Sequence, residues 1–244
     1  MKVGMNFDEM TVAEIVTNNI RTADIFKKNG IDFCCGGNIL VEEVCKKKSV
    51  DYAQLKEEIA ALDAAEVTHK YDLWELDFLT DYVINTHHSY VAEASALILE
   101  YSNKVAKVHG HHYAEVIAIN TAFHKIAEEL NNHMYKEEMI LFPYIKQMAH
   151  AKKSGTNMNS PAFGSIQNPI HMMELEHDTA GDLIKDIKSL SNNFTPPAEA
   201  CNTFRALYAK LEEFQNDLFT HIHIENNILF PKAIKLESEL FNTK

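Results

Sequence analysis

The chain has 244 residues, of which 46% are hydrophobic, enough for the core of one large domain or of a large and a small one. Its formal net charge of −12 leaves no evident basic face for phosphates, which argues against a nucleic-acid partner. The start lacks a signal-peptide core and no apolar run is long enough to span a membrane, so we expect a cytoplasmic protein without a membrane partner. With 8 glycines and 6 prolines the composition favours an all-α fold, and the 13 histidines raise the expectation of a metal site.

Residues 1–65 are predicted to form a small helical domain. Thr11 and Glu14 have the spacing of a capping box, which starts a short helix. Gly30 is expected to end the second helix, because glycine readily adopts the left-handed conformation found after helices. The later helices of this domain are expected at 21–29, 39–47 and 51–61. A polar joint is expected to follow them at 63–70.

A turn with two adjacent cysteines, Cys34 and Cys35, interrupts these helices and continues into Gly36 and Gly37. Asn38 is expected to cap the next helix, so that the thiols lie near a positive helix end, which favours thiolate. We therefore predict that both cysteines are reactive and take part in thiol chemistry. The alternative is a pair of small buried residues in a turn. The chain's 4 cysteines are too few and too unevenly placed for a disulfide scaffold.

Residues 72–240 are predicted to fold as an up-down-up-down four-helix bundle. Their apolar positions follow helical spacing, and clusters of glycine, proline and asparagine mark three connections between long helices. The expected helices are 74–108, 112–150, 169–191 and 197–239.

A histidine followed four residues later by a glutamate occurs twice in one register. His133 and Glu137 precede a Leu-Phe-Pro sequence, and His221 and Glu225 precede the same tripeptide further along the chain. Residues four apart lie on one helix face about one turn apart, so each pair can share a metal site. The repeat also indicates an internally duplicated helical unit.

His87 and His177 join these pairs by a geometric argument. Two residues of an antiparallel hairpin lie at the same height when the turn is midway between them, because each helix rises about 1.5 Å per residue. The midpoint of His87 and His133 is Gly110, and that of His133 and His177 is Gly155; both fall in expected connections. We therefore expect one level set of metal ligands, namely His87, His133, Glu137, His177, His221 and Glu225.

Four imidazoles and two carboxylates suit iron or manganese, and the carboxylates can bridge two ions. The absence of a thiolate from the set disfavours structural zinc. Two such ions keep coordination positions for an oxo bridge, O₂ or NO. His88 is the alternative ligand to His87 if the register slips, although we expect it to face away. Glu138 is expected to point into solvent, and Glu129 and Glu176 are candidate relays of protons or iron.

With these motifs the chain resembles the iron–sulfur cluster repair di-iron proteins, or RIC family, in which a small Cys-Cys-Gly-Gly domain precedes a hemerythrin-like domain. The resemblance covers nearly the whole chain and rests on Asp32 to Gly37, on the paired His-x-x-x-Glu motifs, and on Glu176 to Gly181. It implies two non-haem irons on the six ligands named above. It also implies repair of iron–sulfur clusters damaged by nitric oxide or oxidative stress, by iron donation to the damaged proteins. In hemerythrins that carry O₂, a further histidine stands where this chain has Gly181, which weighs against reversible O₂ carriage.

Two other functions stay open at this stage. The first is an enzyme, a di-iron nitric oxide reductase, which would form N₂O over many turnovers. The second is a hemerythrin-like sensor that holds O₂ or NO reversibly, without turnover or iron release. The sequence also leaves open whether the chain forms a homodimer.

Overall fold

The structure is a computed structural model that describes residues 7–62 and 70–241. Within these ranges it is all-α, as predicted: there is no strand, and an isolated antiparallel bridge joins Thr11 to Leu40. The chain divides into two compact units, Met1–Glu75 with Ile222–Lys232, and Leu76–His221 with Ala233–Lys244. The predicted domain boundaries, 1–65 and 72–240, stay a prediction.

The predicted joint at 63–70 lies outside the described residues except for Lys70. In the part of the chain that the structure describes, no helix combines the length and the apolar character needed to cross a membrane.

The first unit contains short helices that follow the predicted order. The side chain of Thr11 accepts a hydrogen bond from the backbone N–H of Glu14, whose carboxylate accepts from the backbone N–H of Thr11, so the predicted capping box is confirmed. Gly30, with φ of +66°, follows the second helix, and the side chain of Asp51 caps the N-terminus of the helix that begins at Tyr52. The helices are η1 (Phe7–Glu9), α1 (Val12–Asn18), α2 (Thr22–Lys28), α3 (Val41–Lys48), α4 (Tyr52–Ala60) and η3 (Tyr71–Leu73).

The start of α3 differs from the prediction. Asn38 does not cap this helix, which begins at Val41 after Leu40 and has no side-chain cap. The preceding turn is held by α1 instead, because the backbone N–H of Ala13 donates to the carbonyl of Gly37 at 2.9 Å. This backbone bond satisfies one of the N–H groups that the first turn of any helix leaves without an intrahelical partner.

Gly37 has no room for a side chain. A Cβ atom there would lie 2.5 Å from the carbonyl oxygen of Phe33 and 2.9 Å from the Cβ of Ala13. We expect Gly37→Ala to lower the free energy of unfolding by about 1–3 kcal/mol, because the backbone must move to admit the methyl group. Denaturant titration of the full chain measures this. Gly36→Ala is the matched control, since its Cβ would come no closer than 3.3 Å to a neighbouring atom, Cβ of Asp32, whereas the Cβ at Gly37 would clash at 2.5 Å; equal losses would contradict the steric explanation.

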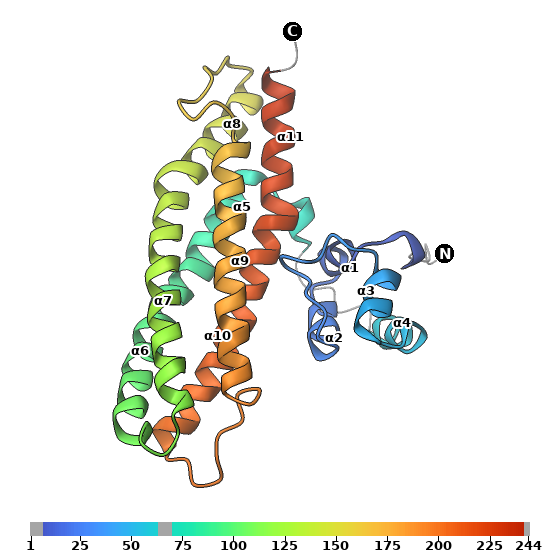
Figure 1. Cartoon of the computed structure of the whole chain (residues 1–244). Coiled ribbons are helices and arrows are strands. Elements are labelled where there is room, and N and C mark those ends of the chain that lie inside the picture. Colours follow the sequence, from blue (N-terminus) through green and yellow to red (C-terminus); the bar gives the residue numbers. More distant parts are fainter. Residues whose placement is uncertain (1–6, 63–69, 242–244) are drawn as a thin grey trace. The chain divides into compact units, whose positions relative to one another are not determined.

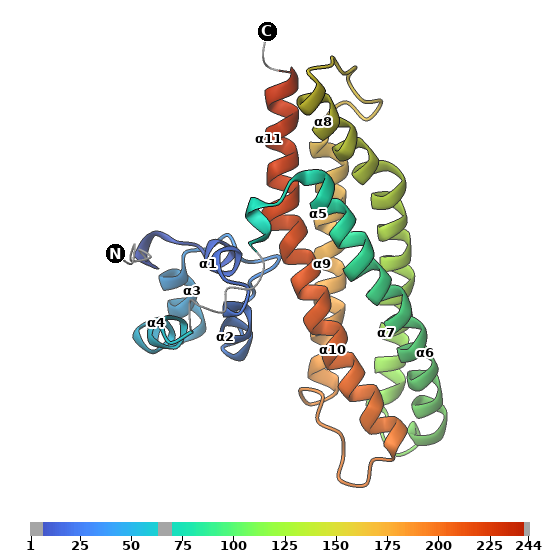
Figure 2. The same ribbon diagram turned by 180° about the vertical axis from the view of Figure 1, so that it is seen from behind.

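The second unit is built from four long rods that run in alternating directions, as the sequence predicts (Figures 1 and 2). Three of the rods combine α-helical and π-helical segments, and the last rod contributes its residues outside Ile222–Lys232 to this unit. The rods are α5 (Leu76–Tyr82), η4 (Val83–His88) and α6 (Ser89–His109); α7 (Glu115–Lys136), η5 (Glu137–Leu141) and α8 (Phe142–Ser154); α9 (Gln167–Leu190); and α10 (Asn202–Ile224), η6 (Glu225–Leu229) and α11 (Phe230–Phe241).

The bundle core is apolar, and its connections follow the predicted turn signals. α7 packs against both α6 and α9. Phe123 of α7 meets Phe214 of α10 in an edge-to-face contact with ring centroids 5.2 Å apart, a favoured aromatic geometry. Gly155 ends α8 in the left-handed conformation, and Asn192 and Asn193 adopt it after α9, which asparagine tolerates better than most residues.

The π-helical segments lie at the predicted metal ligands. η4 contains His87, η5 begins at Glu137 and η6 begins at Glu225. The prolines of the repeated Leu-Phe-Pro sequence, Pro143 and Pro231, account for η5 and η6, because proline lacks the N–H that would bond four residues back and crowds the carbonyl there. A π-helical turn takes up the mismatch by adding one residue. The duplicated motif thus encodes a duplicated distortion directly after each carboxylate.

Candidate metal centre

Buried histidines and glutamates come together in two groups that can hold a metal ion. Within each group, one ligand atom per residue lies within 4.8 Å of the others. Glu137 and Glu225 belong to both groups, as bridging carboxylates would. The first group is His88, Glu137, His221 and Glu225; the second is His133, Glu137, His177 and Glu225.

Five of the six predicted ligands are in these groups, and His88 stands where His87 was expected. The prediction that His88 faces away is wrong, because its side chain is 3% exposed. His87 is equally buried, and its ring stacks on that of His221 with centroids 5.4 Å apart and 7° between the planes. Ligation by His87 stays a prediction, with His88 beside it.

Three of these histidines have their Nδ1 atoms held by carboxylates outside the groups. Such a carboxylate accepts a hydrogen bond from Nδ1–H, which fixes the ring and leaves Nε2 of the neutral imidazole as an acceptor. The pairs are His87 with Asp217 at 2.9 Å, His88 with Glu138 at 2.8 Å and His133 with Glu176 at 3.0 Å.

Two of these carboxylates were not predicted to contact a histidine. Glu138 is exposed, as predicted, and its Oε1 also lies 2.8 Å from Nδ1 of His88. Asp217 was missed; it lies four residues before His221 on α10, and only the tertiary structure brings it to His87. Its spacing from a predicted ligand is the one sequence signal that could have drawn attention to it. Glu176 was predicted to support the centre, and its contact with His133 fits that role.

The Nε2 atoms converge on a carboxylate. Oε2 of Glu137 lies 3.3 Å from Nε2 of His88 and 3.3 Å from Nε2 of His133. Nε2 of His177 lies 3.0 Å from Nε2 of His133, and Nε2 of His87 is buried with no hydrogen-bond partner among the described residues. Acceptor atoms so close to a buried carboxylate are unfavourable unless a cation lies among them. The residues therefore fit a metal ion.

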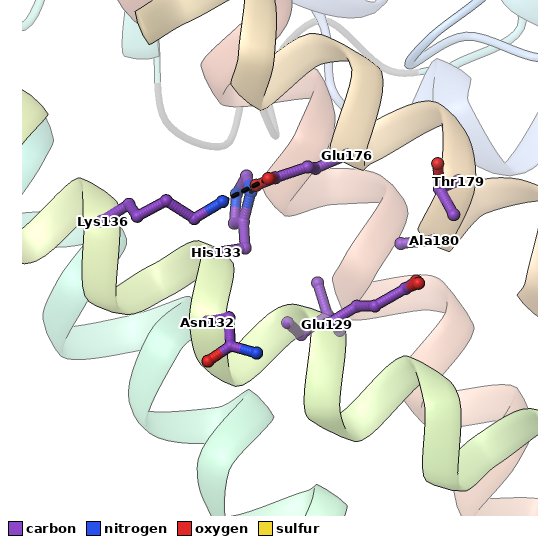
Figure 3. Close-up of a pocket in the computed structure, with 8 residues that line it drawn as sticks. Glu129, Asn132, His133, Lys136, Glu176, Thr179 and Ala180 are labelled. Atoms are coloured by element: carbon purple, nitrogen blue, oxygen red, sulfur yellow. Dashed lines mark hydrogen bonds and ion pairs between the residues drawn. The ribbon is translucent and has the colours of Figure 1, made fainter.

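A surface pocket approaches this centre from the side of Glu176. One oxygen of Glu176 orients His133 and the other pairs with Lys136 (Figure 3). Hydrogen bonds from His133 and Lys136 lower the pKa of Glu176 to about 2 despite partial burial, so this carboxyl group is ionised at neutral pH. The pocket has a volume of about 270 Å³ and is lined by Glu129, Leu130, Asn132, His133, Lys136, Glu176, Thr179 and Ala180.

The thiol turn, defined here as Asp32 to Gly36, is tightly hydrogen bonded. Oδ1 of Asp32 accepts the backbone N–H groups of Cys34 at 3.0 Å, Cys35 at 3.1 Å and Gly36 at 3.2 Å. The Cys34 thiol donates to the same oxygen at 3.3 Å, and its Sγ lies 3.9 Å from that of Cys35. Both cysteines are free; Cys34 is buried and Cys35 is half-buried.

The prediction that the turn favours thiolate is wrong for Cys34. Its hydrogen bond with Cys35, its burial and the nearby carboxylate of Asp32 raise the pKa of the Cys34 thiol well above its usual value. Cys34 is therefore protonated at neutral pH. A thiol role for Cys34 and Cys35 stays a prediction, with the more exposed Cys35 as the candidate for attack.

Comparisons with known proteins match the thiol turn and the metal groups to two different families of domains. Residues 79–233 match the family described as Hemerythrin HHE cation binding domain, and residues 8–63 match ScdA_N, described as Domain of Unknown function (DUF542). A Haemophilus influenzae protein named "Probable iron-sulfur cluster repair protein" is 35% identical over 94% of this chain and 99% of its own length. Proteins named "Iron-sulfur cluster repair protein YtfE" from Musicola paradisiaca and Yersinia pestis are 36% and 35% identical over 96% of this chain and 100% of their own.

The chain belongs to the iron–sulfur cluster repair protein family. This confirms the resemblance drawn from the Cys-Cys-Gly-Gly and paired His-x-x-x-Glu motifs. In this family member the hemerythrin match spans every residue of the two buried groups, and the ScdA_N match spans the thiol turn. The buried histidines and glutamates that could hold a metal ion thus lie within the part of this repair-family chain that matches a cation-binding domain.

Proposed function

We propose that this chain repairs iron–sulfur clusters by donating iron from a centre of two non-haem ions held by the grouped histidines and glutamates. The observation that carries the proposal is the convergence of imidazole acceptors on the buried carboxylate of Glu137. A mixed set of nitrogen and carboxylate ligands suits iron. Relatives named for cluster repair over nearly their full length support the function.

Bound iron would supply redox chemistry and a transferable ferrous ion. The chain's own side chains supply the rest. Glu137 and Glu225 would neutralise the positive charge of the ions. Glu138, Asp217 and Glu176 accept hydrogen bonds from Nδ1–H groups and so orient the imidazoles. Gly181, four residues after His177, offers no side chain. An ion at this centre would therefore break fewer bonds to the protein on leaving than one in a hemerythrin that has a histidine at this position.

The pocket beside His133 supports release on that side of the bundle. Glu129 and Glu176 place carboxylates in its lining, and carboxylates attract ferrous ions. Oε2 of Glu129 is buried and has no hydrogen-bond partner among the described residues, so this oxygen is available to a cation. The recipients would be damaged iron–sulfur proteins in the cytoplasm, and NO and O₂ would also reach the centre.

The test follows iron from the full chain to an acceptor. We expect about two irons per chain, which move into a rebuilt cluster when the reduced protein is incubated anaerobically with an apo cluster protein and a sulfide source. Free ferrous iron with a competing chelator is the control for indirect transfer. Irons that stay bound would refute donation; catalytic N₂O formation would then favour the reductase, and a reversible NO or O₂ adduct the sensor.

Replacing both Cys34 and Cys35 by alanine should leave the iron bound and impair cluster repair, because neither thiol is in the two metal groups. Cys35→Ala should account for most of the loss, since Cys35 is the more exposed thiol. Iron content and cluster rebuilding are measured together. Cys201→Ala, at an exposed cysteine of the second unit, is the control. Loss of iron in the double variant would mean that the thiols bind metal.

A further inference from the structure

One helical segment of the first unit carries both a residue of the metal groups and the contacts of the thiol turn. The segment is Ile222–Lys232, and its Glu225 belongs to both groups. Residues two apart on a helix point to nearly opposite sides. His223 therefore faces away from Glu225, and it is fully buried on that other face.

His223 holds the backbone of the turn. Its Nδ1 lies 3.3 Å from the carbonyl oxygen of Phe33, and its Nε2 lies 3.4 Å from the hydroxyl oxygen of Thr17 on α1. One neutral tautomer satisfies both contacts: Nδ1–H donates to the carbonyl, and Nε2 accepts from the hydroxyl. The imidazole also meets the Phe33 ring edge-on, with centroids 5.9 Å apart.

Asn227 holds the next peptide group. Its Nδ2 donates to the carbonyl oxygen of Cys34 at 3.0 Å. Nδ1 of His223 lies 3.1 Å from this Nδ2, but in the tautomer that donates to Phe33 the two nitrogens are neighbours and not hydrogen-bond partners. Buried carbonyl groups need hydrogen-bond donors. Asp32 satisfies the N–H groups of the turn, whereas His223 and Asn227 satisfy two consecutive carbonyls. The turn has no regular secondary structure of its own to provide those donors.

We propose that His223 and Asn227 are positioning residues that fix the thiol turn on the helical segment carrying Glu225, and thereby keep Cys34 buried. Neither residue is in the metal groups, so the role differs from ligation. The inference concerns the placement of the thiols and does not rest on iron donation. It assigns a reason for a buried histidine and a half-buried asparagine in the C-terminal copy of the repeated motif, where the N-terminal copy has Tyr135 and Met139.

Site-resolved alkylation of the full chain with N-ethylmaleimide, followed by peptide mass spectrometry, tests the proposal. In the unaltered chain we expect Cys35 to react first and Cys34 to be protected. In His223→Leu and in Asn227→Ala, Cys34 should react about tenfold faster, the factor expected when one hydrogen bond that closes a site is lost. Cys45, buried in α3 of the same unit, is the internal control for global opening.

His223→Asn is the conservative variant. The Nδ2 of asparagine occupies nearly the place of Nδ1 in histidine and can donate to the Phe33 carbonyl, so Cys34 should react at close to its original rate. If His223→Leu does not fold, Asn227→Ala decides by itself. An unchanged Cys34 rate in the folded variants, equal acceleration in the Asn and Leu variants, or parallel acceleration of Cys45 would each overturn the proposal. Iron transfer is a separate measurement, so either proposal can fail alone.

Discussion

Replacing Glu137 by leucine is expected to remove most of the bound iron, from about two ions per chain to fewer than about one, because this carboxylate belongs to both metal groups. In the metal-free chain the same change should raise the free energy of unfolding, by on the order of 1 kcal/mol. A fully buried carboxylate disappears, and the facing Nε2 atoms of His88 and His133 lose no hydrogen-bond donor, since they are acceptors.

Iron content by elemental analysis and denaturant titration of the metal-free protein give the two readings. Glu128→Leu is the matched control, at an exposed glutamate on the same rod, and it should change neither by much. Glu225→Leu should resemble Glu137→Leu in its loss of iron. Unchanged iron in both buried variants would refute the assignment, and a large destabilisation of the metal-free chain would contradict the acceptor geometry.

Replacing Glu176 by alanine is expected to weaken metal binding by about 10–100-fold, the usual effect of removing a carboxylate that orients a ligating histidine. The 3.0 Å contact from Nδ1 of His133 is lost, so this imidazole loses the acceptor that fixes its tautomer. The affinity is read by competition with a chelator of known strength. Glu176→Gln should keep most of the affinity, because its amide oxygen can still accept from Nδ1.

Glu174→Ala is the control for this series, because Glu174 lies on α9 two residues before Glu176 and its side chain is 46% exposed. Its metal affinity should stay within about twofold of the original. If Glu176→Ala bound metal as tightly as Glu174→Ala, the carboxylate on Nδ1 would be incidental to the centre. The orientation of His133 in the second metal group would then have to be explained by packing alone.

Much of the fold follows from local signals. The capping box at Thr11, the left-handed residues after helices and the spacing of apolar positions are properties of short segments, and all are confirmed in the structure. The prediction for Asn38 failed because a residue far from it in the chain supplies an acceptor at the start of α3: the backbone N–H of Val41 donates to the carbonyl of Met10 at 3.2 Å. The thiolate prediction for Cys34 failed for the related reason that burial depends on contacts far along the chain.

The repeated His-x-x-x-Glu motif and the midpoint argument predicted six ligands, and five of them lie in the two buried groups that can hold a metal ion. They favoured His87 over His88 because they assumed α-helical spacing, whereas both residues lie in a π-helical segment, η4, in which neighbouring side chains are separated by a smaller angle. Both imidazoles are consequently buried. Sequence spacing assumes a regular helix, and the regularity breaks at the site.

The class of fold and the family could be predicted from the sequence and are confirmed, because helix periodicity, turn residues and the duplicated motif are properties of short stretches of the chain. The metal-ligand set stays a prediction. Which carboxylates contact the imidazoles, and what holds the thiol turn, could be read from the three-dimensional structure alone. Asp217 meets His87, and His223 meets Phe33, across 130 and 190 residues of chain. Pairings at such separations depend on the rotation of each packed helix about its axis, and that rotation is set jointly by all the elements packed against it.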